Sequence, residues 1–217
     1  MKGNMKVVFY VLECMDYEYL MSCNAPVIKS LKPHPAYSYG ATTAAAVHAL
    51  LTGYTPTCAA SPQCPHTQRP RKMIPPEPFF LKKFKQLFLY IPNGWVFQFV
   101  QPYMKNLMPR LLEWHKVFNT KAMVEDFISR SKSDDYFAYF QVMETHPPFL
   151  EGLKEVKPSS PEWDARRRKA VEIADKCLEL LLSVDYDLLV VCADHNIRHD
   201  FAHPDGYKVF IATDPFP

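Results

Sequence analysis

The chain has 217 residues, of which 48% are hydrophobic and 22% are charged, and its formal net charge is +2. This length allows one large domain or two small ones with a full core, and the composition is that of an ordinary globular protein, which excludes extensive disorder. The near-neutral charge gives no reason to expect nucleic acid as a partner. Any functional charge must therefore be local.

The amino-terminal segment does not resemble a targeting signal. Residues Met1–Lys6 lead into an apolar run that Glu13 soon ends, which is too short for a signal peptide. The later apolar stretch Leu87–Val100 is broken by Pro92, so a transmembrane helix is not expected there. These features predict a cytoplasmic protein.

Six cysteines in a cytoplasmic chain are expected to be reduced. Cys14, Cys177 and Cys192 lie in apolar surroundings and are predicted to be core residues. Cys58 and Cys64 could pair or hold a metal, although their spacing matches no established zinc pattern.

The first predicted element is a strand over Lys6–Leu12. Its continuous run of apolar, β-branched and aromatic residues is typical of a strand buried on both faces of a parallel sheet. Glu13, Asp16 and Glu18 follow it. Open α/β sheets bind their ligands at this end of a strand, so these acids are site candidates, with a solvated acidic loop as the alternative.

The next segment predicts a strand, a tight turn and a helix. A short helix over Asn24–Leu31, capped by its asparagine, comes first, and Tyr37–Tyr39 favours a strand. The helix formers of Ala44–Leu51 then end at a glycine. Thr42 and Thr43 stand at the start of this helix, where free N–H groups and the helix dipole favour an anion. Either threonine could instead be a simple helix cap.

The middle of the chain is less informative. The Pro-rich passage Thr55–Pro78 predicts a surface loop or lid. The aromatic and basic stretch Pro78–Leu112 is ambiguous between helix and strand. Core packing explains its aromatic residues, and contact with a membrane surface or a lipid substrate is the alternative.

The second half of the chain alternates strong helix and strand patterns. Thr120–Ser131 predicts an amphipathic helix with Thr120 as its cap, and Tyr136–Met143 predicts a second buried strand that runs into His146. Ser160–Ser183 carries apolar residues at helical spacing, as a long crossover helix would.

The last elements bring a further acid and several histidines. Asp187–Ala193 predicts a third buried strand that ends in Asp194 and His195, and Tyr207–Thr213 predicts a final strand. His199 and His203 follow His195 at equal spacing, and the nearby proline favours a loop for them. We expect Asp194 and His195 to meet Glu13 and His146 at one edge of the sheet, where the turn with Thr42 and Thr43 also lies.

Acids and imidazoles gathered at one edge are what a metal site requires. Carboxylate oxygen and imidazole nitrogen suit Zn²⁺ or Mn²⁺, and such an ion would stabilise the alkoxide of a neighbouring hydroxyl as a nucleophile. The expected fold class is α/β, a three-layer α/β/α sandwich with a mostly parallel central sheet.

The order of these motifs resembles the alkaline phosphatase superfamily, and within it the sulfatase-like branch that includes phosphoethanolamine transferases and lipoteichoic acid synthases. The motifs are NAPVIKSL, ATTAAAVHALLTG, THPPF and VVCADH with a later HP. The likeness covers most of the chain apart from Cys58 to about Phe118, which is expected to be an insertion in a single domain spanning residues 1–217. In sulfatases the nucleophile precedes the threonine of LLTG by nine residues, which selects Thr43 over Thr42.

The resemblance implies a role for each motif residue. Glu13, Thr43, Asp194 and His195 would hold one divalent metal, Zn²⁺ or Mn²⁺. Thr43 would be the nucleophile. His146 and His203, with His199 in reserve, would contact the phosphate, protonate the leaving group or supply a second metal site.

Three positions depart from the family pattern. The sulfatase C/S-x-P-S-R signature is absent after Thr43, which disfavours a sulfatase mechanism. Asn196 replaces the usual glycine after the DH pair, and Cys14 stands where many relatives have a second acid.

The resemblance therefore implies a metal-dependent hydrolase or transferase of phosphomonoesters or phosphodiesters, with a small-molecule or lipid-linked substrate. A sulfatase-like ester hydrolase of the same fold, and a binding relative without turnover, are the alternatives.

Overall fold

The structure is a computed structural model, and it describes residues 4–38, 43–52, 81–92, 110–111, 119–132, 135–149, 156–197 and 208–215. The predicted loop over Thr55–Pro78, Cys58, Cys64, Thr42, His199 and His203 lie outside these residues. Among the residues that are described, no helix combines the length and the apolar character needed to cross a bilayer.

Seven strands in the described residues form one sheet, in the order β2-β7-β6-β1-β5-β3-β4. Its centre is parallel: β1 pairs with both β5 and β6, and β3 pairs with β5 and β4. β7 runs antiparallel to β6 and to β2. The strands are β1 Lys6–Leu12, β2 His34–Tyr37, β3 Gln86–Tyr90, β4 Arg110–Leu111, β5 Tyr136–Val142, β6 Leu188–Ala193 and β7 Lys208–Asp214.

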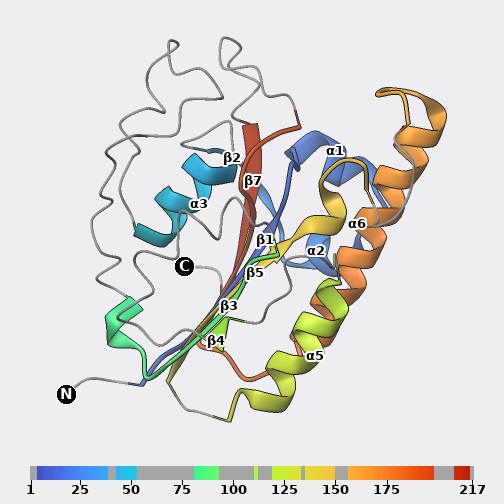
Figure 1. The fold of residues 1–217 in the computed structure, drawn as a ribbon. Coiled ribbons are helices and arrows are strands. Elements are labelled where there is room, and N and C mark those ends of the chain that lie inside the picture. Colours follow the sequence, from blue (N-terminus) through green and yellow to red (C-terminus); the bar gives the residue numbers. More distant parts are fainter. Residues whose placement is uncertain are drawn as a thin grey trace.

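Helices cover both faces of this sheet (Figure 1). The helices α1, α2, α5 and α6 lie on one face, and α3 lies on the other. The helical elements are α1 Tyr17–Ser22, α2 Pro26–Ser30, α3 Thr43–Thr52, η1 Leu81–Lys83, α5 Thr120–Arg130, η2 Met143–Thr145 and α6 Pro161–Leu181. The predicted three-layer α/β/α class with a mostly parallel sheet is confirmed.

Each face of the sheet has its own hydrophobic core. On the α5 and α6 side, Tyr10, Phe127 and Phe140 are fully buried together with the apolar residues of α6. On the other side, Val47 and Leu51 of α3 pack against alternate residues of the same strands. Burial on both faces explains why β1, β5 and β6 are continuous apolar runs in the sequence.

The buried strands were predicted closely from the sequence. β1 has the predicted bounds, and β5 and β6 differ from the prediction by one residue at one end. The strand expected at Tyr37–Tyr39 lies earlier, as β2. Within the segment expected to be an insertion, Gln86–Tyr90 is a strand of the main sheet, paired with β5.

Two predicted helix caps are wrong. Asn119, not Thr120, caps α5, because the Thr120 hydroxyl instead donates to the carboxylate of Glu144. The cap position of α2 is Ala25, which has no side-chain acceptor. Asp175 of α6 takes its place and accepts hydrogen bonds from the first N–H groups of α2, at 2.8 Å from Ile28 N.

Phe127 is expected to be a main contributor to stability, because its buried ring meets the rings of Phe88, Tyr136 and Phe140 at 5.0 to 5.4 Å. Phe127→Ala should lower the free energy of unfolding by about 3–5 kcal/mol. The neighbouring Ile128, 39% exposed, is a matched control. Ile128→Ala should cost about 1 kcal/mol or less. Urea unfolding of both variants measures the difference, and equal losses would contradict this description of the core.

Candidate active site

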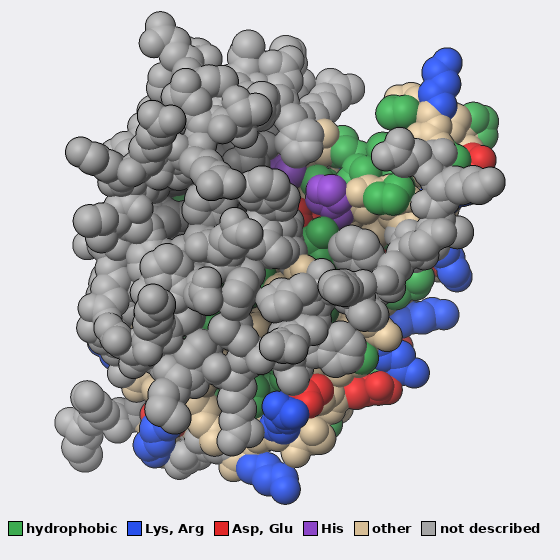
Figure 2. All heavy atoms as spheres, viewed as in Figure 1, with side chains coloured by type: hydrophobic (Ala, Val, Ile, Leu, Met, Phe, Trp, Pro, Cys, Tyr) green, Lys and Arg blue, Asp and Glu red, His purple; other side chains and the backbone are tan. Residues whose placement is uncertain are grey.

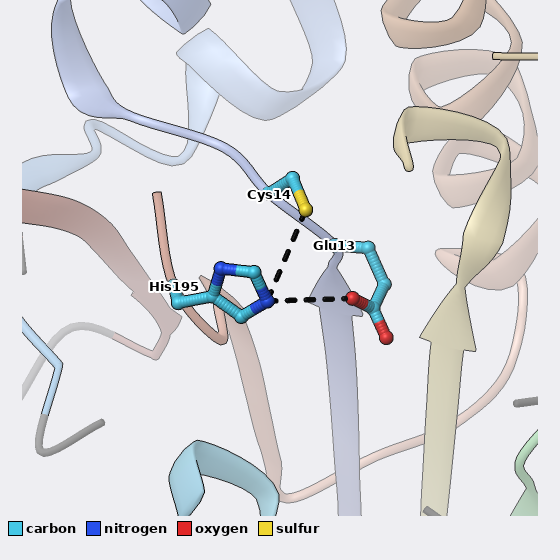
Figure 3. Close-up of side chains that lie close together, drawn as sticks. All are labelled: Glu13, Cys14 and His195. Carbon is cyan, nitrogen blue, oxygen red and sulfur yellow. Dashed lines mark hydrogen bonds and ion pairs between the residues drawn. The ribbon is translucent and has the colours of Figure 1, made fainter. Parts of the chain in front are cut away.

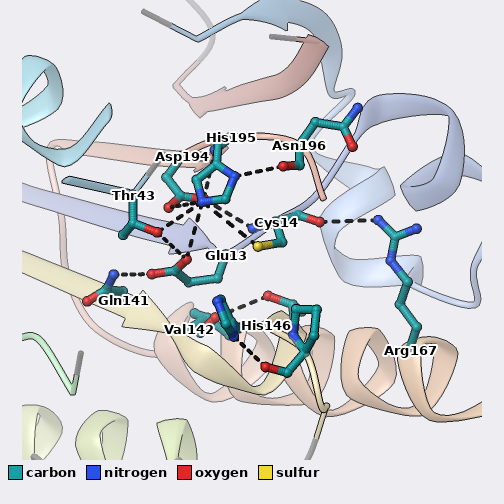
Figure 4. A network of polar contacts seen from close by, with 12 residues as sticks. Glu13, Cys14, Thr43, Gln141, Val142, His146, Arg167, Asp194, His195 and Asn196 are labelled. Carbon is teal, nitrogen blue, oxygen red and sulfur yellow. Dashed lines mark hydrogen bonds and ion pairs between the residues drawn. The ribbon is translucent and has the colours of Figure 1, made fainter. Parts of the chain in front are cut away.

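The site lies where β1, β5 and β6 end. Leu12 pairs with Val142 on one side and with Ala193 on the other, so the residues that follow these strands meet at one edge of the sheet. Glu13 follows β1, and Asp194 and His195 follow β6. All three side chains are buried, and Figure 4 shows them converging on Thr43.

Thr43 is the first residue of α3, on the opposite face of the sheet from α6. Its Oγ1 lies 2.9 Å from Glu13 Oε2 and 2.9 Å from His195 Nε2. The hydroxyl therefore sits both at a helix N-terminus and between an acid and an imidazole. The structure brings together the four residues predicted from the sequence to share a metal.

His195 is oriented by the backbone of the next residue, Asn196. Its Nδ1 lies 2.7 Å from the carbonyl oxygen of Asn196, and a carbonyl can only accept, so Nδ1 carries the hydrogen. In the neutral ring, Nε2 therefore directs its lone pair at Thr43. A backbone carbonyl on the far nitrogen is the usual way of fixing a metal-binding histidine.

Asp194 is held by one of its two oxygens. Oδ1 accepts from the backbone N–H groups of Cys14, at 3.1 Å, and of His195, at 2.7 Å. Oδ2 is buried, has no hydrogen-bond donor among the described residues, and lies 3.4 Å from His195 Nε2. A buried carboxylate oxygen without a donor is costly unless a cation, or a proton on a neighbouring carboxyl group, compensates it.

The number of hydrogens available at the centre of the cluster also indicates that a positive charge is missing. Thr43 has one hydroxyl hydrogen, but both Glu13 Oε2 and His195 Nε2 lie at hydrogen-bonding distance from its oxygen. Both are acceptors when Glu13 is ionised and His195 is neutral, so one close contact then lacks a hydrogen. Either an extra proton or a cation must satisfy the group.

Burial, and after it the charge of Asp194, raises the pKa of Glu13 well above its usual range. Hydrogen bonds from Thr43 and Gln141 act in the opposite direction but are weaker causes. Without a cation, the folded protein therefore tends to keep a proton on Glu13 at a pH where an exposed glutamate has lost it.

The donor atoms are spaced as ligands of one small ion. Oxygen and nitrogen ligands about 2.1 Å from a tetrahedral zinc lie about 3.4 Å from one another. Here the distances are 2.9 Å from Thr43 to Glu13 and to His195, 3.4 Å from His195 to Asp194, and 3.8 Å from His195 to Glu13. The residues present therefore fit a divalent metal.

A thiol also faces this cluster. Glu13, Cys14 and His195 each offer a ligand atom within 4.8 Å of the other two, and all three residues are buried (Figure 3). The prediction that Cys14 is buried is correct, and its free thiol lies beside Glu13 and His195.

Sequence reasoning missed two supporting residues. Gln141 donates from Nε2 to Glu13 Oε1, and a lone amide in the otherwise apolar run of β5 was the available signal. Arg167 of α6 donates to the carbonyl of Cys14, at 3.2 Å, and to Asp16, at 3.1 Å. The available signal was helical spacing, because Arg167, unlike its two basic neighbours, lies on the same face of α6 as Ala170 and Val171.

His146 lies at the same edge, after β5 and η2, and is half-buried. Its Nδ1 is 2.5 Å from the carbonyl oxygen of Pro147, which can only accept, so Nδ1 is the donor in this contact. Figure 2, viewed as in Figure 1, shows purple histidine side chains beside green hydrophobic ones on the face turned to the viewer. His203, predicted to act with His146, is outside the described residues.

No family model matches the chain, and no curated protein matches it. Solved structures do. A protein of the alkaline phosphatase superfamily from Vibrio parahaemolyticus is 15% identical with a TM-score of 0.64, and the match covers 98% of this chain and 60% of that one. The lipoteichoic acid synthase LtaP from Listeria monocytogenes is 13% identical with a TM-score of 0.66, covering 97% and 65%.

A third structure is the Streptococcus pyogenes phosphoglycerol transferase GacH in complex with sn-glycerol-1-phosphate. It is 15% identical with a TM-score of 0.57, and the match covers 98% of this chain and 69% of that one. The present chain thus spans 60% and 65% of the length of the first two structures. At these identities the likeness establishes the fold, and the resemblance inferred from the sequence motifs is confirmed at that level.

The raised pKa of Glu13 predicts how stability depends on pH when a chelator is present. The folded state holds a proton that the unfolded chain has released, so the free energy of unfolding should fall as the pH rises above about 4.3, by up to about 1.4 kcal/mol per pH unit. Glu13→Gln should remove the contribution of Glu13 to this dependence of the free energy of unfolding on pH. Urea unfolding between acid and neutral pH measures it.

The exposed Glu18 provides the control, since Glu18→Gln should leave the slope unchanged. In the wild type, a divalent metal should oppose the fall in the free energy of unfolding at higher pH, because the metal competes with the proton for Glu13. A Glu13→Gln variant with the wild-type slope would contradict the assignment.

Proposed function

We propose that this protein is a metal-dependent enzyme that cleaves or transfers phosphate esters through Thr43. The observation that carries the proposal is the position of the Thr43 hydroxyl, at the N-terminus of α3 and 2.9 Å from both Glu13 and His195. The structural neighbours support the substrate class, because two of them are named as a lipoteichoic acid synthase and a phosphoglycerol transferase.

Glu13, Thr43, Asp194 and His195 would hold the metal, Zn²⁺ or Mn²⁺. When bound, the ion would neutralise the two carboxylates and favour the alkoxide form of the threonine. The protein's own contribution is to pre-position the ligands, since the strand ends and the Asn196 carbonyl fix Glu13, Asp194 and His195 before any ligand arrives.

The first step is attack by Thr43 Oγ1 on the phosphorus atom. The new bond forms as the bond to the ester oxygen breaks, and the hydroxyl proton passes to Glu13 Oε2, its acceptor at 2.9 Å. The departing oxygen takes a proton from His146 or His203. The N–H groups in the first turn of α3 stabilise the charge on the phosphoryl oxygens.

The second step releases Thr43. Water or an acceptor alcohol attacks the phosphothreonine and gives its proton to the histidine that protonated the leaving group. The phosphorus to threonine bond breaks, and Thr43 takes its proton back from Glu13. Water gives a hydrolase, and an alcohol gives a transferase. The substrate is proposed to be a small-molecule or lipid-linked phosphate ester.

A reducing compartment, such as the cytoplasm, suits this site. The four cysteines in the described part of the chain, Cys14, Cys23, Cys177 and Cys192, are all buried free thiols. One of them faces the metal ligands, where oxidation would remove a donor.

Replacing the nucleophile provides the direct test. Thr43→Ala should lower turnover of aryl phosphate mono- and diesters by about 10³-fold or more, because no other hydroxyl is placed to take its role among the described residues of the cluster. Thr43→Ser should retain part of the activity. Mass spectrometry of the acid-quenched wild type should locate a phosphoryl group on Thr43.

The matched control is Thr213→Val, a threonine of β7 away from the cluster, which should keep full turnover. An aryl sulfate should be a poor substrate, since Thr43 cannot be converted to formylglycine. Undiminished phosphate-ester turnover by Thr43→Ala would overturn the mechanism. Metal binding without turnover of any ester would favour the alternative of a binding relative.

A further inference from the structure

Cys14 occupies an unusual backbone position beside the metal ligands. Adjacent side chains of a strand point to opposite faces, so Glu13 and Cys14 would diverge if β1 continued. Instead β1 ends at Leu12, and Cys14 has a φ of 55°, in the left-handed region that most non-glycine residues avoid. This turn brings both side chains to the same side, toward His195 (Figure 3).

Both peptide groups of Cys14 are held in place. Its N–H donates to Asp194 Oδ1 at 3.1 Å, and its carbonyl accepts from Arg167 Nη2 at 3.2 Å. Arg167 is itself buried and also pairs with Asp16, at 3.1 Å. A left-handed residue persists where its surroundings enforce it, and such positions gather at functional sites.

The thiol is aimed at the cluster. Cys14 is fully buried, and its Sγ lies 3.9 Å from His195 Nε2. Sulfur and nitrogen ligands of one zinc ion, at about 2.3 and 2.1 Å from it, lie about 3.6 Å apart. Asp194 Oδ2, which is buried without a donor among the described residues, lies 3.4 Å from the same nitrogen. A ligand shared by these atoms would satisfy all of them.

We propose that Cys14 is a thiolate ligand of the metal, a sulfur donor in addition to Glu13, Thr43, Asp194 and His195. On binding, a sulfur to metal bond forms and the thiol proton leaves to solvent, with no change of oxidation state. Thiolate is a soft ligand, so the site prefers Zn²⁺ or Co²⁺ to Mn²⁺ or Mg²⁺. The inference rests on the metal site of the proposed function and decides between the two metals considered there.

The competing explanation is structural. A buried cysteine often behaves as a small apolar residue with a weak S–H donor, and at 3.9 Å its thiol could simply donate to His195 Nε2. In that case Cys14 would fill space beside an oxygen and nitrogen site. The two explanations differ in whether sulfur bonds to the metal.

Cobalt substitution distinguishes the two explanations. Co²⁺ gives an intense near-ultraviolet charge-transfer band only when a thiolate binds it. With oxygen and nitrogen ligands alone, it gives only weak visible bands. The metal-free protein, in a non-thiol reductant, is titrated with Co²⁺. We expect one equivalent to produce the near-ultraviolet band and Cys14→Ser to abolish it. Zn²⁺ should displace the cobalt and remove the band.

Two controls isolate Cys14 from the other cysteines. All proteins carry Cys58→Ser and Cys64→Ser, so that neither of these residues contributes a band. Cys177→Ser is the matched variant, because Cys177 is equally buried but lies in α6 within the apolar core. It should keep the full band, and any loss of folding from a buried serine should be similar in both variants.

Metal preference provides a second measurement. Cys14→Asp should lower the ratio of Zn²⁺ to Mn²⁺ affinity by about 100-fold, because it replaces the soft donor by a hard one. Weak visible bands without the charge-transfer band would overturn the role of Cys14 and leave the metal site intact. Failure of the folded protein to bind Co²⁺ or Zn²⁺ would overturn the metal site itself, and with it the proposed function.

Discussion

The site depends on the placement of two buried carboxylates, Glu13 and Asp194, at one edge of the sheet. Among the described residues, their donors are backbone N–H groups, the Gln141 amide and the Thr43 hydroxyl, none of which carries a full positive charge. Burial of negative charge with only neutral donors is unfavourable, and the raised pKa of Glu13 is its direct result. A divalent cation would remove this cost, so the feature that destabilises the metal-free protein is also the one that would favour binding of a metal.

The fold supports this arrangement with rigid elements. β1, β5 and β6 are buried on both faces and in register, so the residues after them cannot move apart without breaking the pairing at the centre of the sheet. Arg167 fixes the turn after β1 from the side of α6, while α3 brings Thr43 from the opposite face. A constellation assembled from both faces of a sheet is held more precisely than one confined to a loop.

The sequence predicted the parts of this site that follow from strand patterns. Asp194 and His195 follow an apolar run directly, so their meeting with Glu13 could be expected from parallel pairing alone. Selection of Thr43 over Thr42 needed the family resemblance, because both residues stand at the helix start. The helix cap at Thr120 was wrong since its hydroxyl is used by a distant carboxylate, Glu144, and such a tertiary contact leaves no local pattern. The role of His203 stays a prediction.

The turn at Cys14 could not be predicted from the sequence, because the alternation of side chains along a strand predicts the opposite direction for the Cys14 side chain. Its position has a consequence for the balance of charge. An acid there would add a third negative group to a buried cluster that already holds Glu13 and Asp194, whereas burial raises the pKa of the Cys14 thiol and keeps it neutral until a metal arrives. A cysteine therefore lowers the electrostatic cost of folding without metal, yet still supplies a negative ligand on binding. A cysteine ligand would also restrict the site to metals that bind sulfur well.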